Sequence, residues 1–223
     1  MAGVLEDLKL QALVDRLHVQ SAAQEAETHA WFGERARRGE LSWDGLDETS
    51  HRYMADKLVA LEPAKAEFCH LMCRALGARR VVEVGTSFGV STLYLAAAVR
   101  ANGGGAVIGT EHEPAKAAAA RAVFAEAGLG DLIDLREGDL RETLKVIEGP
   151  VDFVLVDIWV EMARPALELI APHLRQGAVV VADNTTQVRQ AYKAFFEFVG
   201  DPANGLRTMT LPFDGGLEMI VKA

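Results

Sequence analysis

The stretch VVEVGTSFGVST, residues 81–92, decides the fold. Its β-branched residues 81–84 predict a buried strand, Gly85 and Gly89 predict a tight turn, and the residues from Val90 onward begin a helix. Glycine lets a ligand approach the backbone, and the start of a helix offers unpaired N–H groups. The stretch therefore predicts a nucleotide-type pocket between the strand and the helix.

The turn favours a ligand that carries a positive charge and no phosphate. Its G-x-x-x-G spacing places Ser87 where dinucleotide enzymes carry the middle glycine of G-x-G-x-x-G, which lets a pyrophosphate approach the helix. The acid Glu83 lies inside the strand, where a site for an anion would gain nothing from it. The alternative interpretation is a plain strand-to-helix turn of an α/β protein.

Composition narrows the class of protein and its partners. With 223 residues and 50% hydrophobic content, the chain can bury one large core. It carries 23 basic and 32 acidic residues, a net charge of −9, without a block of Lys or Arg. This balance argues against nucleic acid and anionic membranes as partners.

Cysteine usage and the first residues predict a cytoplasmic location. Cys69 and Cys73 are four positions apart on an expected helix, unlike a C-x-x-C pair, so we expect buried free thiols in a reducing compartment. The start, MAGVLEDLKL, lacks the basic and apolar regions of a secretory signal. We find no apolar run of about 18 residues that would span a membrane.

The first part of the chain reads as a helical extension, residues 1–62. Residues 2–38 predict one or two amphipathic helices, 39–47 a turn-rich break with Trp43 and Gly45, and 48–61 a further helix. Pro63 begins the next helix, which runs to residue 76. The extension can cover the pocket or pair with a second subunit as a homodimer, and both roles stay open.

From residue 80 onward, strand and helix patterns alternate. Strands are expected at 81–84, 106–110, 132–136, 151–156 and 178–182, with helices between them and a last helix at 187–199, then closing strands at 207–211 and 217–221. Repeated β-α units build a parallel sheet covered on both faces, and the short last connection makes the closing strand antiparallel. We predict an α/β fold: a Rossmann-like, seven-stranded, mostly parallel sheet in a domain spanning 63–223.

Polar residues follow the strands, where ligands bind in open α/β sheets. They are Thr86 and Ser87, Glu111 and His112, Gly138 and Asp139, Asp157, and Asp183 with Asn184. Glu111 lies about 20 residues beyond the glycine turn, where an acid commonly accepts hydrogen bonds from the ribose hydroxyls. An exposed loop acid is the alternative for this residue.

Asp157, Asp183 and Asn184 form a second group with a different chemistry. Two carboxylates and an amide oxygen on adjacent strand ends are the hard ligands that Mg²⁺ prefers. The competing interpretation of residues 183–186 is a helix cap, because Asp, Asn and Thr side chains all bind free N–H groups there.

At this point the sequence resembles a known family. The segments VVEVGTSFGVSTLYLA, GTEHEP, REGDLRETL, VDFVLVDIW and VVVADN resemble the class I S-adenosylmethionine-dependent O-methyltransferases, specifically the catechol and caffeoyl-CoA O-methyltransferase group. The resemblance covers residues 63–223 in order and spacing, and several independent motifs agree. The cofactor of that group is cationic at sulfur and has no phosphate, as the glycine turn favours.

The resemblance implies a role for each site residue. It places Glu83, Gly85, Ser87, Gly89 and Ser91 at the methionine side of the cofactor, Glu111 at the ribose, Gly138 and Asp139 at the adenine, Asp157 between cofactor and metal, and Asp183 and Asn184 at the metal. The implied reaction is transfer of a methyl group from the sulfonium to a hydroxyl of a small molecule. A divalent metal, Mg²⁺, would hold the acceptor and lower its hydroxyl pKa.

One residue departs from the family. The family carries a lysine three residues after the first metal aspartate, near the substrate hydroxyl as general base, and here that residue is Val160. An aliphatic side chain cannot accept a proton. The metal alone, or Glu161, His112 or His51, would have to serve, or the acceptor is not a catechol, so the sequence assigns no catalytic base.

The sequence therefore predicts a cytoplasmic enzyme, a methyltransferase acting on a small hydroxylated acceptor. The first alternative is a metal-independent methyltransferase with a non-catechol acceptor, which Val160 favours. The second is a cofactor-binding protein without catalysis that works through its helical extension. A nicotinamide oxidoreductase is the third, and Ser87 argues against it.

Overall fold

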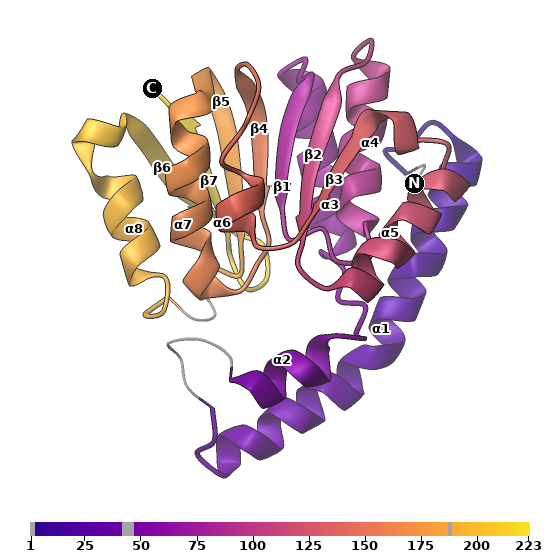
Figure 1. Ribbon diagram of the computed structural model, residues 1–223, viewed down its shortest axis with the longest axis vertical. Helices are drawn as coiled ribbons and strands as arrows, with labels where there is room; N and C mark the ends of the chain where they lie inside the picture. The colour runs from indigo at the N-terminus through magenta and orange to yellow at the C-terminus, as the bar shows by residue number, and fades with distance from the viewer. Residues whose placement is uncertain (1–2, 42–46, 187–188) are drawn as a thin grey trace.

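The computed structural model describes residues 3–41, 47–186 and 189–223. Within these ranges one sheet has seven strands in the order β3-β2-β1-β4-β5-β7-β6 (Figure 1). The strands are β1 (Arg80–Val84), β2 (Ala106–Glu111), β3 (Ile133–Glu137), β4 (Val151–Val156), β5 (Leu174–Asp183), β6 (Leu206–Leu211) and β7 (Leu217–Lys222).

Strand direction confirms the predicted Rossmann-like sheet. β1 pairs in parallel with β2 and β4, β2 with β3, and β4 with β5. β7 runs antiparallel to both β5 and β6. The carboxyl ends of β1 to β5 therefore lie along one edge of the sheet, where open α/β folds bind their ligands.

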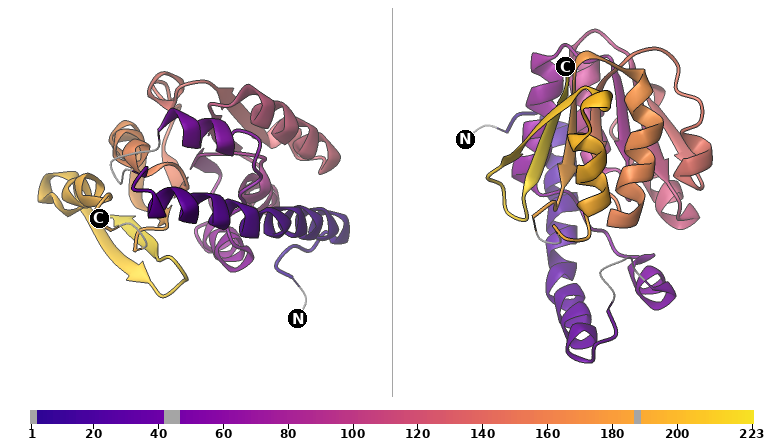
Figure 2. Two further views of the ribbon diagram at one scale, coloured as in Figure 1. Left: turned by 90° about the horizontal axis from the view of Figure 1, so that it is seen from below. Right: turned by 90° about the vertical axis from the view of Figure 1, so that its left-hand side faces the viewer.

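Helices cover both faces of the sheet (Figure 2). They are α1 (Leu8–Arg37), α2 (Glu48–Met54), α3 (Pro63–Ala75), α4 (Val90–Ala101), α5 (Pro114–Glu126), α6 (Leu140–Thr143), α7 (Val160–Ile170) and α8 (Lys193–Gly200), with short 3-10 turns at Gly130–Leu132, Ala171–His173 and Pro202–Asn204. Alternate strand residues point to opposite faces. One core packs β-strand side chains against α1, α3, α4 and α5, and the other packs them against α6, α7 and α8.

Helix α1 joins the sheet core to a projecting arm. Asp7 caps the helix, accepting hydrogen bonds from the backbone N–H groups of Lys9 and Leu10. The first half of α1 is buried against the core through apolar side chains at helical spacing, Leu10, Leu13, Val14 and Leu17. The second half continues past the carboxyl edge of the sheet, where α2 lies beside it (Figure 1). We call this second half of α1 together with α2 the arm.

Aromatic stacking and an ion pair hold the arm together. The rings of Trp31 on α1 and Tyr53 on α2 stack with centroids 4.1 Å apart. The guanidinium of Arg35 lies 2.6 Å from Asp47, the residue that caps α2. Stacked aromatics contribute beyond their buried area, so these contacts fix α2 against α1.

The segment after α2 differs from the prediction of a helix over 48–61. The helix ends at Met54, and α1 side chains take the backbone N–H groups that a longer helix would have used. The N–H of Leu58 donates to Gln24 Oε1 at 3.1 Å, and the N–H of Ala60 donates to Ser21 Oγ at 3.0 Å. Side-chain acceptors compete with helix formation in this way. Residues 58–61 are consequently free to lie across the glycine turn.

Two other predicted segments, the helix over 187–199 and the break over 39–47, include residues that the structure does not describe. The helix predicted over 187–199 begins at Lys193, and its residues 187–188 lie outside the described residues. The break predicted over 39–47 includes 42–46, with Trp43 and Gly45, which also lie outside them. Among the helices that the structure describes, none is both long enough and apolar enough to cross a membrane.

The glycine turn gives the first prediction. Gly85 has φ +95°, and a Cβ at this position would lie 2.0 Å from the backbone oxygen of Asp157. Gly85→Ala should therefore lower the free energy of unfolding by about 3 kcal/mol or more, through backbone strain plus overpacking. Gly128 also has a positive φ, +63°, but it borders open space. Gly128→Ala should cost about 1 kcal/mol from strain alone. Urea unfolding measures both, and equal losses would contradict the close approach.

Candidate active site

A cavity of about 620 Å³ lies at the carboxyl edge of the sheet, between the sheet and the arm. The strand ends supply one wall, with Gly85, Ser87, Glu111, Gly138, Asp139, Asp157, Asp183 and Asn184. The arm and the residues after it supply another, with Phe32, His51, Met54, Ala55 and Val59. The start of α7 and its approach add Trp159, Val160, Glu161 and Met162. The cavity is therefore large enough for a nucleoside and a small molecule side by side.

Most of the predicted site residues share this cavity, and three do not line it. Glu83 is fully buried beneath the turn, and Gly89 is the N-cap residue of α4. Ser91, in the first turn of α4, lines a smaller hollow next to the main cavity. The structure thus brings together the residues predicted for ribose, adenine and metal, while these three support the turn from behind.

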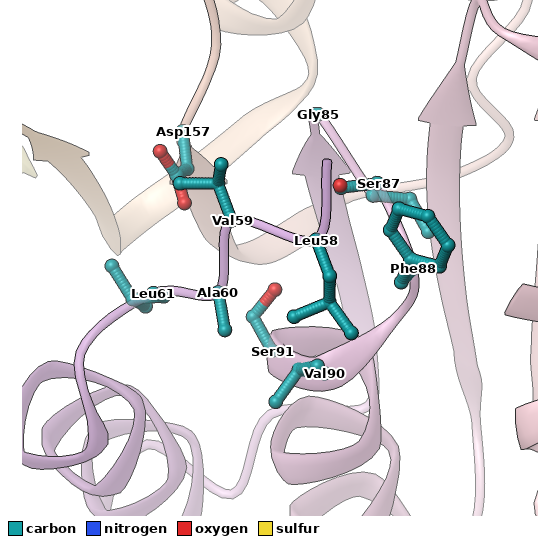
Figure 3. Close-up of a pocket in the computed structure, with 11 residues that line it drawn as sticks. Leu58, Val59, Ala60, Leu61, Gly85, Ser87, Phe88, Val90, Ser91 and Asp157 are labelled. Carbon is teal, nitrogen blue, oxygen red and sulfur yellow. The ribbon is translucent and has the colours of Figure 1, made fainter. Parts of the chain in front are cut away.

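The smaller hollow, about 10 Å³, lies between the glycine turn and residues 58–61. Figure 3 shows Val59 directed toward Asp157 and the hydroxyls of Ser87 and Ser91 turned toward the space below the turn. Ser87 Oγ is buried and finds no hydrogen-bond partner within the described part of the chain. A buried polar atom left unpaired is costly, so a ligand group that binds this hydroxyl would be stabilising.

Glu83 accepts hydrogen bonds from three hydroxyl groups. Thr86 Oγ1 donates at 2.9 Å, Ser91 Oγ at 2.7 Å and Thr92 Oγ1 at 2.5 Å. Burial raises the pKa of Glu83, and the three hydroxyl donors oppose that increase. The side chain ties β1 to the turn and to the first turn of α4, so it fixes the shape of the pocket floor.

Glu111, at the end of β2 and predicted to bind a ribose, holds the glycine turn in place. Its Oε2 accepts from the N–H of Ser87 at 2.7 Å, and its Oε1 accepts from the N–H of Glu113 at 2.8 Å. Each carboxylate oxygen can accept a second hydrogen bond. Glu111 therefore has the capacity left to bind two ligand hydroxyls, and it lines the cavity.

Gly138 and Asp139 border the cavity next to Glu111. The N–H of Gly138 donates to the backbone oxygen of Glu111 at 2.9 Å, which fixes the end of β3 beside the end of β2. Asp139 caps α6 and pairs with the Arg141 guanidinium, which lowers the pKa of Asp139 to about 2. This carboxylate is therefore ionised and already occupied by Arg141.

Asp157 and Asp183 lie at the ends of the adjacent strands β4 and β5. Burial, with further contributions from the charges of Asp183 and Glu83, raises the pKa of Asp157 to about 8. Burial also raises the pKa of Asp183, although Lys65 opposes it. Asp183 Oδ1 accepts from Lys65 Nζ at 2.7 Å, and Oδ2 accepts from the Asn184 amide at 3.1 Å.

The chemistry of this donor set fits a divalent cation. Two carboxyl groups, Asp157 and Asp183, lie near a single buried ammonium, that of Lys65, which is bonded to Asp183. Carboxylate and amide oxygens are hard ligands. No cluster of three His, Cys, Asp or Glu residues placed to hold a metal occurs in ranges 3–41, 47–186 and 189–223. The set therefore depends on Asn184 as its third protein ligand.

The three residues considered as proton acceptors all line the cavity. His51 comes from α2, His112 from the end of β2, and Glu161 from α7. The His51 ring packs edge-on against Trp159, with centroids 5.9 Å apart, and both line the cavity. Val160 is the first residue of α7 and lines the same region as an aliphatic wall.

Sequence reasoning missed the contributions of the segment that precedes β1. Lys65 lies in the run PAKAEF, where a lysine between alanines is typical of an exposed helix face. Residues 58–61 were assigned to a helix and instead cover the glycine turn. No local pattern indicates either placement, because both depend on contacts with residues far away in the sequence.

The chain is similar in sequence to methyltransferases. A family model described as a methyltransferase domain matches residues 82–185. The catechol O-methyltransferase of Mycobacterium tuberculosis is 34% identical over 127 residues, which are 56% of this chain and 57% of that protein. The chain spans little more than half the length of the curated relatives it matches.

Solved structures share the fold over about four fifths of this chain. The cofactor-bound protein Rv0187 from MTB is 26% identical, with a TM-score of 0.69, over 78% of this chain and 87% of that one. The O-methyltransferase TomG from Streptomyces achromogenes, solved in complex with SAM, is 24% identical, with a TM-score of 0.67, over 80% of this chain and 91% of that one. At 24% identity, the similarity to TomG shows a shared fold and nothing beyond it.

The buried acid beneath the turn gives the second prediction. Glu83→Ala leaves three buried hydroxyls without their acceptor and should lower the free energy of unfolding by at least about 3 kcal/mol. Glu83→Gln keeps one acceptor oxygen and the side-chain shape, so it should cost about half as much. Denaturant unfolding of the two variants measures the difference. Equal stability of the wild type and Glu83→Ala would show that these hydrogen bonds do not hold the turn.

Proposed function

We propose that the chain is a class I S-adenosylmethionine-dependent O-methyltransferase and that it moves a methyl group from S-adenosylmethionine to a hydroxyl of a small molecule; the methyltransferase-domain match and the similar O-methyltransferases support this. One observation carries the proposal. Glu111, Asp157 and the glycine turn face one cavity whose volume, about 620 Å³, exceeds what a nucleoside alone requires.

The proposed cofactor site follows the chain from β1 to β4. Glu111 binds the ribose hydroxyls through the lone pairs that its backbone partners leave free. Gly138 and Asp139 would border the adenine, and Asp157 would face both the cofactor and the metal. Gly85 and Ser87 contact the methionine part, and Glu83, Gly89 and Ser91 hold that part of the turn in shape. The unpaired hydroxyl of Ser87 supports this assignment.

Catalysis in this proposal comes from alignment within a largely apolar cavity. Bound S-adenosylmethionine supplies an electrophilic methyl group on its sulfonium. The strand ends hold the cofactor, and the arm and α7 hold the acceptor opposite it. Orientation of two reactants in a shared site can supply a large part of a rate enhancement. Phe32, Met54 and Trp159 exclude water around the acceptor.

We propose that the acceptor is an apolar, hydroxylated molecule, with an aromatic ring as the best match to the wall. Trp159 is 37% exposed and packs against His51, so its ring is available to a planar ligand. Val160 cannot take the hydroxyl proton. His51, His112 and Glu161 each line the cavity and can accept it, and His51 is placed on the acceptor side.

We also propose that a divalent metal assists the reaction. Asp157, Asp183 and Asn184 would hold Mg²⁺, which would lower the pKa of the acceptor hydroxyl. The hard carboxyl and amide oxygens that meet at the ends of β4 and β5 support this. The alternative, methyl transfer without a metal to a non-catechol acceptor, is supported by Val160 and by the Lys65 ammonium that already binds Asp183.

We propose that residues 1–62 act as a cap over the domain formed by 63–223. The arm supplies Phe32, His51 and Met54 to the acceptor side of the cavity. We also propose a homodimer, supported by two apolar side chains on the outer surface of α1, Leu8 and Val19, which are 81% and 71% exposed. Light scattering of the purified chain tests it. A cytoplasmic location is supported by the free buried thiols of Cys69 and Cys73.

The third prediction concerns the ribose acid. Glu111→Gln should weaken the binding of S-adenosylhomocysteine at least ~10-fold in isothermal titration, because hydrogen bonds to a charged group are lost. Glu148→Gln makes the same chemical change at an exposed position and should leave affinity unchanged. If Glu111→Gln binds as tightly as the wild type, Glu111 does not hold the ribose.

The fourth prediction separates cofactor from metal. Asp183→Asn should remove the stimulation of methyl transfer by Mg²⁺, measured with a panel of catechols and other phenols, because one carboxylate ligand is lost. Its affinity for S-adenosylhomocysteine should stay within about three-fold of the wild type, a difference below 1 kcal/mol. Asp214→Asn, in an exposed loop, is the matched control. An Asp183→Asn variant that Mg²⁺ still stimulates as much as the wild type would exclude this residue as a ligand.

A further inference from the structure

Lys65 is a charged side chain in the interior of the protein. It lies in the first turn of α3 and is 1% exposed, among the largest fully buried side chains of the described chain. A buried ammonium is unfavourable unless it is paired and hydrogen-bonded. A lysine in this place therefore calls for a specific partner.

Its partner is Asp183. Lys65 Nζ lies 2.7 Å from Asp183 Oδ1, and both side chains are almost completely buried, with exposed fractions of 1% and 6%. The carboxylate of Glu62 is farther away, at 3.6 Å, and half exposed, so water screens it. The charge of Lys65 therefore interacts more strongly with the buried acid at the end of β5 than with Glu62 at the surface.

The ammonium adds a fixed positive charge to the proposed metal site. Lys65 Nζ bonds one oxygen of Asp183 at 2.7 Å, and it also acts on Asp157 through space. A cation bound by these acids would be repelled by the charge of Lys65. In a buried site each charge has a large effect on the affinity for a divalent cation, because the surroundings screen it weakly.

We propose that Lys65 is a positioning residue with a fixed counter-charge: it holds Asp183 by one oxygen and keeps the affinity of the strand-end acids for divalent cations low. This inference rests on the metal part of the proposed function.

Three substitutions separate the charge of Lys65 from its hydrogen bond. Lys65→Gln keeps an N–H donor for Asp183 and removes the charge. Lys65→Arg keeps the charge. Lys9→Gln repeats the first change on the exposed face of α1 as a control. Binding of Mn²⁺ alone to the full chain is measured by electron paramagnetic resonance, and the change in Tm with added Mn²⁺ is measured in parallel.

Lys65→Gln should bind Mn²⁺ at least ~10-fold more tightly than the wild type, since one positive charge has left the site. Its Tm should rise with Mn²⁺ more than that of the wild type, because binding to the folded state stabilises it. Lys65→Arg and Lys9→Gln should remain within about three-fold of the wild type, less than a 1 kcal/mol difference.

Unchanged or weaker Mn²⁺ binding by Lys65→Gln would overturn the inference, and so would equal tightening in Lys65→Arg. If Lys65→Gln unfolds at assay temperature without Mn²⁺, its refolding on addition of Mn²⁺ supports the inference, and failure to refold overturns it. Titration of each variant with S-adenosylhomocysteine without metal tests the cofactor site separately. If the wild type does not bind S-adenosylhomocysteine, the proposed methyl transfer is contradicted, and the inference about Lys65 is judged separately by the Mn²⁺ data.

Discussion

The close packing of two strand ends sets the geometry of the whole site. β1 and β4 are neighbours, and the turn after β1 passes so near the Asp157 carbonyl that any side chain at residue 85 would overlap it. The N–H of Asp157 donates to the Val84 oxygen at 3.0 Å, and the N–H of Thr86 donates to the Thr110 oxygen at 2.9 Å. These contacts join the ends of β4, β1 and β2. The acids that follow the strands are therefore forced into one crevice.

Bringing several acids together in a buried crevice is unfavourable because their charges repel and lose water. Three kinds of contact reduce this cost. Burial raises the pKa of Glu83, which accepts hydrogen bonds from three hydroxyl groups, and Glu111 is bound by backbone N–H groups. Asp183 is paired with Lys65. Asp157 accepts no side-chain hydrogen bond from the residues that the structure describes, and burial raises its pKa to about 8. A cationic ligand beside Asp157 would relieve that cost, which is why a sulfonium fits the pocket better than a phosphate.

Much of the domain could be predicted because its signals are local. The β-branched run and the two glycines around residues 81–92 indicate strand, turn and helix by themselves, and the repeated β-α units indicate a mostly parallel sheet. The acids after each strand could be grouped for the same reason, since parallel strands end at one edge. The end of α2 at Met54 and the position of Lys65 could not be predicted. Each is decided by a partner distant in sequence, Ser21 and Gln24 for the first and Asp183 for the second.

A crystal structure of the protein with S-adenosylhomocysteine tests the central claim most directly, namely that the strand-end acids form one crevice that binds a sulfonium nucleoside. The account predicts both ribose hydroxyls within hydrogen-bond distance of Glu111 and the sulfur on the side of Asp157, facing the wall formed by the arm. A nucleoside bound away from Glu111, or one whose sulfur points away from Asp157, would contradict it.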